Sequence, residues 1–216
     1  MATDLKLVAQ AVIDADGALV RALTEQAISE GLAAEQILGE GLIAGMDVIG
    51  EQFGAGEVFV PEVLLSARAM QEGLKLLRPA LAATGAPPKG TAVVGTIQGD
   101  RHDIGKNLVA MMLEGAGFRV IDLGSDVPIE RFVAVAAAEQ AEVVGISTLL
   151  TTTMPRMRRV AQAFAEANLR EKVKIMIGGA PITQDFANQI GVDGYGGDAH
   201  LAVTLAESFV AQLRRG

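Results

Sequence analysis

The hydrophobic pattern of the chain changes its period at a short tract rich in Gly and Pro, residues 84–90 (TGAPPKG). Before this tract, apolar residues recur at the spacing of amphipathic helices. After it, they form short continuous runs separated by helical patterns, which is typical of a parallel sheet that is covered on both faces. The sequence therefore predicts two domains of different architecture, at residues 1–88 and 89–216.

The first domain is expected to be a bundle of four helices joined by short links. One helix lies near the N-terminus, and a second runs from Gly17 to Glu30, between an Asp16 N-cap and a Gly31 stop. The third and fourth are expected at about 34–53 and 61–82. The residues expected to face inward are Leu19, Leu23, Ala27 and Ile28 of the second helix, Ile37, Leu38, Leu42, Met46 and Ile49 of the third, and Val63, Leu64, Ala67, Met70, Leu74 and Leu77 of the fourth.

The second domain is expected to be a flavodoxin-like (Rossmann-like) α/β domain with a five-stranded parallel sheet. The predicted strands are 91–97, 119–123, 143–147, 173–177 and a weaker run at 193–195. The predicted helices are 104–116, 129–139, 154–168, 182–190 and 199–214. The expected strand order is 2-1-3-4-5, so ligands should bind beyond the carboxyl ends of the first and third strands, where the order reverses.

Polar and glycine residues gather at that expected edge. His102, one of only two histidines, follows the first strand within the run GDRHDIGKN. Ser147 and Thr148 end the third strand, and the pair Gly178-Gly179 ends the fourth. Because the carboxyl ends of parallel strands lie at one edge, these three segments should converge on one crevice.

Each of these features also has an ordinary structural interpretation. A lone histidine in a loop is most often solvated, and Asp103 before a helix is a natural N-cap. Gly105 fits a tight turn or close helix packing, and the hydroxyl residues between 147 and 153 fit a helix-capping tract. The glycine pair fits an ordinary turn at a strand end.

Several ligand classes are disfavoured by what the sequence lacks. It has neither a dinucleotide-binding glycine motif after the first strand nor a phosphate-binding loop. A phosphorylation receiver domain would need Asp where Ser147 ends the third strand. The absence of Cys and the presence of only two histidines disfavour a zinc site, and the net charge of -8 disfavours nucleic acid as a partner. No signal peptide and no apolar run of about 20 residues is present, so a cytoplasmic protein with no membrane contact is expected.

Read together, the motifs resemble a known family. The run Asp100-x-His102-x-x-Gly105 is followed after 41 residues by Ser147-x-Leu149, and after another 28 by Gly178-Gly179. This resembles the three-part signature of cobalamin-binding domains that hold the cofactor base-off, with a protein histidine on cobalt. Residues 53–62 (FGAGEVFVPE) resemble the junction in the four-helix cap of methionine synthase and of free-standing corrinoid methyl carriers.

The resemblance implies a role for each matching residue. His102 would be the lower axial ligand of cobalt, and Asp100 would accept a hydrogen bond from its other ring nitrogen. Thr153, in place of the Ser of methionine synthase, would extend this relay, and Gly105 would leave room for the displaced nucleotide tail. The other implied cofactor-binding residues are Asp103, Ser147, Leu149, Thr151, Gly178, Gly179, Tyr195, Asp198 and Ala199 and, over the upper cobalt face, Phe53 and Val60, the last in place of Leu.

The implied function is that of a non-catalytic methyl carrier. It would bind cobalamin or a related corrinoid and shuttle a methyl group from a substrate-specific methyltransferase to a second one that acts on tetrahydrofolate or coenzyme M. His102 would bind and release cobalt in each cycle, a reductive activase would be a further partner, and the 84–90 linker would be the hinge of the cap. The methyl donor is not readable from the sequence.

Three alternatives belong to other functional classes. A cobalamin-dependent sensor would be expected to carry a separate DNA-binding module and a less acidic surface. The cobalamin-binding subunit of a carbon-skeleton mutase would use adenosylcobalamin and normally lacks the four-helix cap. A flavodoxin-like domain that has lost its ligand would not be expected to keep the whole signature.

Overall fold

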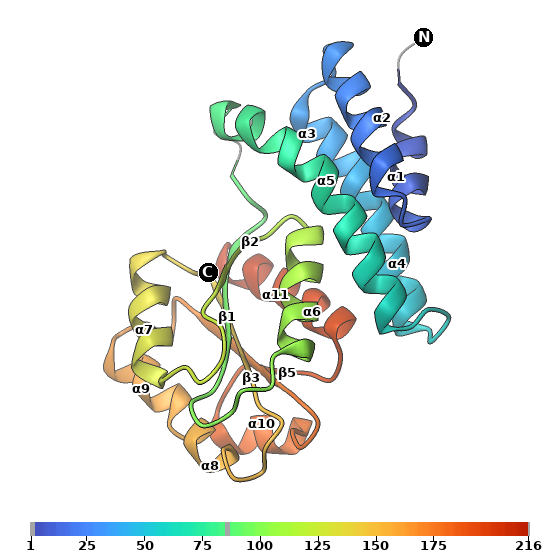
Figure 1. Cartoon of the computed structure of the whole chain (residues 1–216). Coiled ribbons are helices and arrows are strands. Elements are labelled where there is room, and N and C mark those ends of the chain that lie inside the picture. The colour runs from blue at the N-terminus through green and yellow to red at the C-terminus, as the bar shows by residue number, and fades with distance from the viewer. Residues whose placement is uncertain (1–2, 85–86, 216) are drawn as a thin grey trace. The chain divides into compact units, whose positions relative to one another are not determined.

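The computed structural model describes residues 3–84 and 87–215, which divide into two compact units (Figure 1). The first contains the described residues up to Pro88 together with Gly115–Gly117. The second contains Lys89–Glu114 and the described residues from Phe118 onward. Residues 85–86 of the expected hinge lie outside the described residues.

The helical unit has the four helices that the sequence predicts. They are α1 (Leu5–Ile13), α2 (Gly17–Ser29), a continuous third helix made of α3 (Ala34–Gln36), η1 (Ile37–Ile43) and α4 (Ala44–Gly54), and α5 (Val60–Thr84). The Asp16 carboxylate accepts a hydrogen bond from the N–H of Leu19 at 3.0 Å, and Gly31 ends α2 with a φ of +84°. The middle of the third helix is π-helical, which the regular helical spacing did not predict.

The buried face of α2 differs from the predicted one. Leu19 and Ile28 are exposed, whereas Val20, Thr24 and Ala27 are buried. A Cβ on Gly73 of α5 would lie only 2.9 Å from Thr24 Oγ1 and 3.0 Å from Val20 Cγ1. The two helices thus approach closely at this glycine, which turns the smaller residues of α2 inward. Of the other predicted inward residues, Leu23, Leu38, Leu64 and Leu74 are half-buried, and Ala27, Ile37, Leu42, Met46, Ile49, Val63, Ala67, Met70 and Leu77 are buried.

The second unit is the predicted parallel sheet, with strands in the order β2-β1-β3-β4-β5. The strands are β1 (Thr91–Thr96), β2 (Arg119–Asp122), β3 (Val143–Ser147), β4 (Lys174–Gly178) and β5 (Gly194–Gly196). In the register between β1 and β3, Thr96 pairs with Ser147, so the two strands end side by side. This places the segments after β1 and β3 together at the switch point of the sheet.

Helices cover both faces of this sheet (Figure 1). They are α6 (Ile104–Gly115) and α11 (Ala199–Leu213) on one side, and on the other α7 (Ile129–Ala138), α8 (Met154–Met157), α9 (Val160–Glu166) and α10 (Gln184–Ile190). Phe132, Phe164 and Phe186 of α7, α9 and α10 join one core cluster with the strands. The helix predicted at 154–168 is broken after Met157, where Arg159 N–H bonds to the carbonyl of Arg156 in a tighter turn. Within the described residues, no helix has the length and apolar character needed to cross a membrane.

The helical unit contains a buried hydroxyl that can be tested. Thr24 Oγ1 has no hydrogen-bond partner within the described part of the chain. Thr24→Val keeps the shape and removes the unpaired group, so the free energy of unfolding should rise by about 1 kcal/mol in urea titrations. Thr24→Ser keeps the hydroxyl, loses a methyl group, and should lower it by about 1 kcal/mol. A Thr24→Val protein less stable than the wild type would show that the hydroxyl is satisfied.

Candidate functional site

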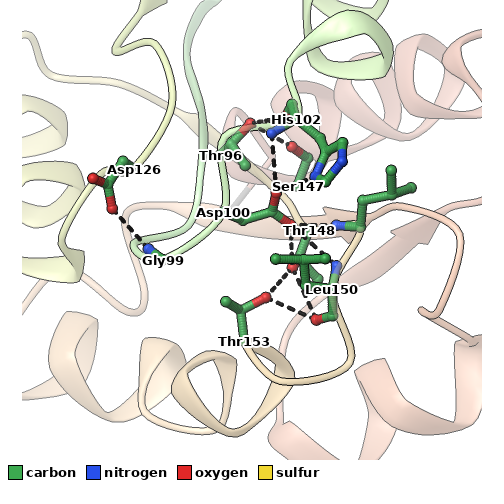
Figure 2. Close-up of polar contacts among 10 residues, drawn as sticks. Thr96, Gly99, Asp100, His102, Asp126, Ser147, Thr148, Leu150 and Thr153 are labelled. Atoms are coloured by element: carbon green, nitrogen blue, oxygen red, sulfur yellow. Dashed lines mark hydrogen bonds and ion pairs between the residues drawn. The ribbon is translucent and has the colours of Figure 1, made fainter.

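The site is built around the carboxylate of Asp100, which lies in the loop between β1 and α6 and is fully buried. Its Oδ1 accepts hydrogen bonds from Nδ1 and from the main-chain N–H of His102, at 2.7 and 3.0 Å. Its Oδ2 accepts hydrogen bonds from Thr148 Oγ1 at 2.9 Å and from the main-chain N–H groups of Leu149 at 2.6 Å and Leu150 at 3.1 Å (Figure 2). One carboxylate therefore joins the loop after β1 to the loop after β3.

These hydrogen-bond donors keep the Asp100 carboxylate ionised. Burial favours the neutral acid, but the hydrogen bonds from the main chain of His102 and Leu149 and from the side chains of His102 and Thr148 outweigh it. The pKa of Asp100 consequently lies well below its usual range. An ionised carboxylate can only accept hydrogen bonds, so the ring proton of a neutral His102 must sit on Nδ1.

The second ring nitrogen of His102 is therefore a lone-pair donor. The His102 side chain is 55% exposed, although its Asp100 partner is fully buried. No hydrogen bond to Nε2 is found in the described part of the chain. A neutral imidazole that is held by a carboxylate on one side and open on the other has the arrangement typical of a metal ligand.

Thr153 connects to Asp100 through Thr148 and not directly. The Thr148 hydroxyl donates its hydrogen to Asp100 and also lies within hydrogen-bond distance of Thr153 Oγ1. Thr153 Oγ1 itself donates to the carbonyl oxygen of Leu150 at 2.8 Å. Thr153 occupies the N-cap position of α8, but its side chain makes no capping bond. The relay that was expected between Asp100 and Thr153 thus contains Thr148, which sequence reasoning treated only as a strand end.

A second pair of hydroxyls holds the main chain of His102. The buried Thr96 Oγ1 donates to the carbonyl oxygen of His102 at 2.9 Å, and Ser147 Oγ lies 2.9 Å from the same hydroxyl. Because Thr96 has one hydroxyl hydrogen, Ser147 is the donor in the second bond. Sequence reasoning missed Thr96, since it lies in a strand and its burial resembles that of its apolar neighbours.

The glycines of the signature fall into two kinds. Gly179 has a φ of +121°, and a Cβ there would lie 1.8 Å from the carbonyl oxygen of Thr148. A Cβ on Gly178 would lie 2.8 Å from the carbonyl oxygen of Gly196. The fold itself needs both of these glycines. At Gly105, in the first turn of α6, a Cβ would meet nothing within 4 Å among the described residues, so neither a tight turn nor close packing explains this glycine.

The remaining predicted residues are distributed around this centre and beyond it. Those in the loops after β1 and β3 are exposed: Asp103, Leu149 and Thr151. Tyr195 lies in β5, Asp198 caps α11 by accepting a hydrogen bond from Leu201 N–H at 2.8 Å, and Ala199 begins that helix. Phe53 in α4 and Val60 at the start of α5 belong to the helical unit, where both are half-buried.

Comparison with known proteins identifies the two units. Residues 90–204 match the family described as the B12 binding domain, and residues 5–78 match a second family with the same description. The trimethylamine corrinoid protein of Methanosarcina barkeri is 43% identical over 196 residues, which is 90% of each chain. The dimethylamine corrinoid protein 1 of Methanosarcina acetivorans is 44% identical over 208 residues, which is 96% of this chain and 97% of that one.

Solved structures agree with these sequence matches. A methanol:cobalamin methyltransferase complex from Methanosarcina barkeri matches with a TM-score of 0.86 and 33% identity, over 96% of this chain and 79% of that chain. A cobalamin-binding protein from Desulfitobacterium hafniense DCB-2 matches with a TM-score of 0.79 and 30% identity, over 95% and 98% of the two chains.

The five hydrogen bonds that Asp100 accepts predict how its substitution changes the free energy of unfolding. Asp100→Asn places an amide NH2 group against N–H and hydroxyl donors, so the free energy of unfolding at pH 7 should fall by about 3 kcal/mol. The lowered pKa of Asp100 in the folded protein stabilises it fully above the ordinary value of about 4, and this contribution is lost as the pH falls towards the folded value. The wild type should therefore lose more stability than the variant between about pH 5 and pH 3.

Urea unfolding at a series of pH values measures both effects. Asp198→Asn is the matched control, because the exposed Asp198 carboxylate only caps a helix and Asn is an equally good cap. Equal pH dependence in the wild type and Asp100→Asn would show that Asp100 is not held ionised in the fold.

Proposed function

The chain belongs to the B12-binding corrinoid proteins, and from this premise we propose that it carries a methyl group on a corrinoid whose cobalt is bound by His102. The single observation that supports this ligand is the state of the His102 ring. Its Nδ1 is hydrogen-bonded to the buried Asp100 carboxylate at 2.7 Å, while the side chain is 55% exposed and its Nε2 has no hydrogen bond in the described part of the chain.

The residues present fit such a cofactor. The described part of the chain contains no group of three or more His, Cys, Asp or Glu side chains that could hold a bare ion. A corrin macrocycle brings its own equatorial nitrogens, so a single protein imidazole is a sufficient axial donor. The open space beside Gly105 lies three residues from that imidazole, in the first turn of the helix that follows it.

The Asp100 network gives His102 a defined role during methyl transfer. The chemistry that a bound corrinoid supplies is the reversible methylation of its cobalt. Asp100 would orient the ring towards the metal, as carboxylates behind metal-bound histidines do. With no metal bound, Nε2 would be the open ring nitrogen, next to the ionised Asp100 carboxylate on Nδ1. Thr148 and Thr153 supply ordered hydroxyls on the far side of that carboxylate.

The nucleotide tail of the corrinoid is proposed to pass over Gly105 and between the segments at 147–151 and 178–179. Gly178 and Gly179 would present only main chain to the tail on their side of this path. Tyr195, Asp198 and Ala199 would lie near the end of the tail. Phe53 and Val60 of the helical unit would shield the upper face of the cofactor.

The partners proposed for this carrier are two methyltransferases and a reductive activase. Relatives carry the names of trimethylamine and dimethylamine corrinoid proteins, and a similar solved structure is a methanol:cobalamin methyltransferase complex. Methylamines are therefore the first donors to test, with methanol as the comparison. Transfer of a labelled methyl group to this chain by a cognate methyltransferase would distinguish a carrier from a sensor, which binds cobalamin without accepting the group.

Electron paramagnetic resonance of the cob(II)alamin complex tests the ligand directly. With protein labelled with ¹⁵N in histidine, the axial nitrogen should give a doublet splitting, whereas natural-abundance protein should give a triplet. His102→Ala should abolish the protein-derived splitting, and His200→Ala, the only other histidine change available, should leave it intact. Failure to bind any corrinoid, or a ¹⁵N-histidine doublet that persists in His102→Ala, would refute the proposal.

A substitution at Gly105 should weaken cofactor binding without weakening the fold. Gly105→Ala introduces a methyl group that meets no atom of the described chain, and Ala is the better helix former by about 1 kcal/mol. The free energy of unfolding of the cofactor-free protein should stay the same or rise. The affinity for cobalamin should fall at least about fivefold, because one extra methylene group in a packed site costs about 1–3 kcal/mol. Spectrophotometric titration with hydroxocobalamin measures this, and unchanged affinity would contradict the proposed path of the tail.

A further inference from the structure

Asp126 lies in the loop after β2 and is hydrogen-bonded to the turn that precedes His102, the proposed cobalt ligand. Its main-chain N–H donates to the carbonyl oxygen of Asp100 at 2.9 Å, and its Oδ1 accepts a hydrogen bond from the N–H of Gly99 at 2.8 Å (Figure 2). We propose that Asp126 is a positioning residue, which holds the Gly99–Asp100 turn so that His102 is presented to cobalt. The inference rests on the proposed function.

The main-chain ladder between the two loops stops just before this turn. Thr96 N–H bonds to the carbonyl of Gly124, Val127 N–H to that of Thr96, and Gln98 N–H to that of Val127, at 2.9, 2.9 and 2.8 Å. Beyond Gln98 the chain turns away from the ladder. The two hydrogen bonds of Asp126 hold the next two residues, Gly99 and Asp100, to the loop after β2, beyond the point where regular main-chain pairing ends.

The backbone at this contact limits which residues can make it. Asp126 has a φ of +60° and Gly99 a φ of +92°. Apart from Gly, Asn and Asp are the residues that adopt this left-handed conformation most readily. The contact therefore needs both a side-chain oxygen that reaches Gly99 and a residue that tolerates the conformation, and Asp or Asn meets both needs.

Asp126 adds a restraint from a third loop to the Asp100 main chain, whose N–H also donates to the carbonyl oxygen of Ile97 at 3.1 Å. Thr148, Leu149 and Leu150 all hold the Asp100 side chain, from the loop after β3. Asp126 holds the main chain of the same residue, from the loop after β2. The Asp126 carboxylate holds the N–H of Gly99, at the start of the same turn. Loss of this bond would loosen the turn that carries Asp100 and let the His102 ring leave the productive orientation.

Three substitutions of Asp126 separate the effect of its side-chain acceptor from the effect of its left-handed backbone conformation. Asp126→Ala loses both the acceptor and the conformational preference, Asp126→Gly loses only the acceptor, and Asp126→Asn keeps both. Asn168→Ala is the matched control, because Asn168 has a φ of +56° in the same unit but lies after α9, away from the site. Affinity for hydroxocobalamin, the histidine splitting of the cob(II)alamin spectrum and amide exchange in the cofactor-free protein are measured for each.

Asp126→Ala and Asp126→Gly should weaken hydroxocobalamin binding about 3- to 10-fold, the value of one lost hydrogen bond, and reduce the fraction of cofactor that shows histidine splitting. Both should speed exchange of the His102 amide in the cofactor-free protein. Asp126→Asn should restore all three readouts. Asn168→Ala should lower thermal stability and leave these readouts unchanged.

Two results would overturn the inference. The first is an Asp126→Ala protein with the hydroxocobalamin affinity, histidine splitting or amide exchange of the wild type. The second is a loss in Asp126→Asn or Asn168→Ala as large as the loss in Asp126→Ala. Amide exchange needs no cofactor, so it decides the role of Asp126 even if the wild type binds no corrinoid. A wild type that binds no corrinoid, or a ¹⁵N-histidine splitting retained in His102→Ala, would instead refute the proposed function.

Discussion

The structure of the site depends on one buried carboxylate that accepts five hydrogen bonds. Burying Asp100 without partners would be strongly unfavourable, and each donor that offsets this cost comes from a loop at the switch point of the sheet. Two donors belong to His102 after β1, and three belong to residues 148–150 after β3. The charge of Asp100 therefore determines the arrangement of both loops and the tautomer of the proposed ligand.

The same arrangement holds His102, the proposed ligand, in one orientation in the cofactor-free protein. Asp100 holds the ring and the N–H of His102, and Thr96 holds its carbonyl oxygen. Only Nε2 is left without a partner in the described part of the chain. A donor atom that is fixed in this way loses little conformational entropy on binding metal, so more of the binding free energy remains for the complex.

The sequence predicted the order of the strands and the convergence of their polar ends, because both follow from the spacing of apolar runs and from the topology of parallel sheets. It did not predict that Thr148 lies between Asp100 and Thr153, since neighbouring hydroxyls in a turn differ only in the direction of their side chains. The buried face of α2 depends on close approach at Gly73 of α5, which a one-dimensional pattern does not contain, and the π-helical stretch departs from the regular helical spacing of the sequence. The exposed Asp126 carries no hydrophobic signal, and its contacts are visible only in three dimensions.

The proposed cobalt ligand is an imidazole whose Nδ1 is protonated towards Asp100 and whose Nε2 is left for the metal. Long-range ¹H–¹⁵N correlation spectra of the His102 ring, recorded before and after addition of a diamagnetic cob(III)alamin, measure both nitrogens in one experiment. The neutral ring should show a protonated Nδ1 and a bare Nε2, and only the Nε2 resonance should move strongly when the cofactor binds. A ring protonated at Nε2, or an Nε2 resonance that does not respond to bound cofactor, would contradict the account.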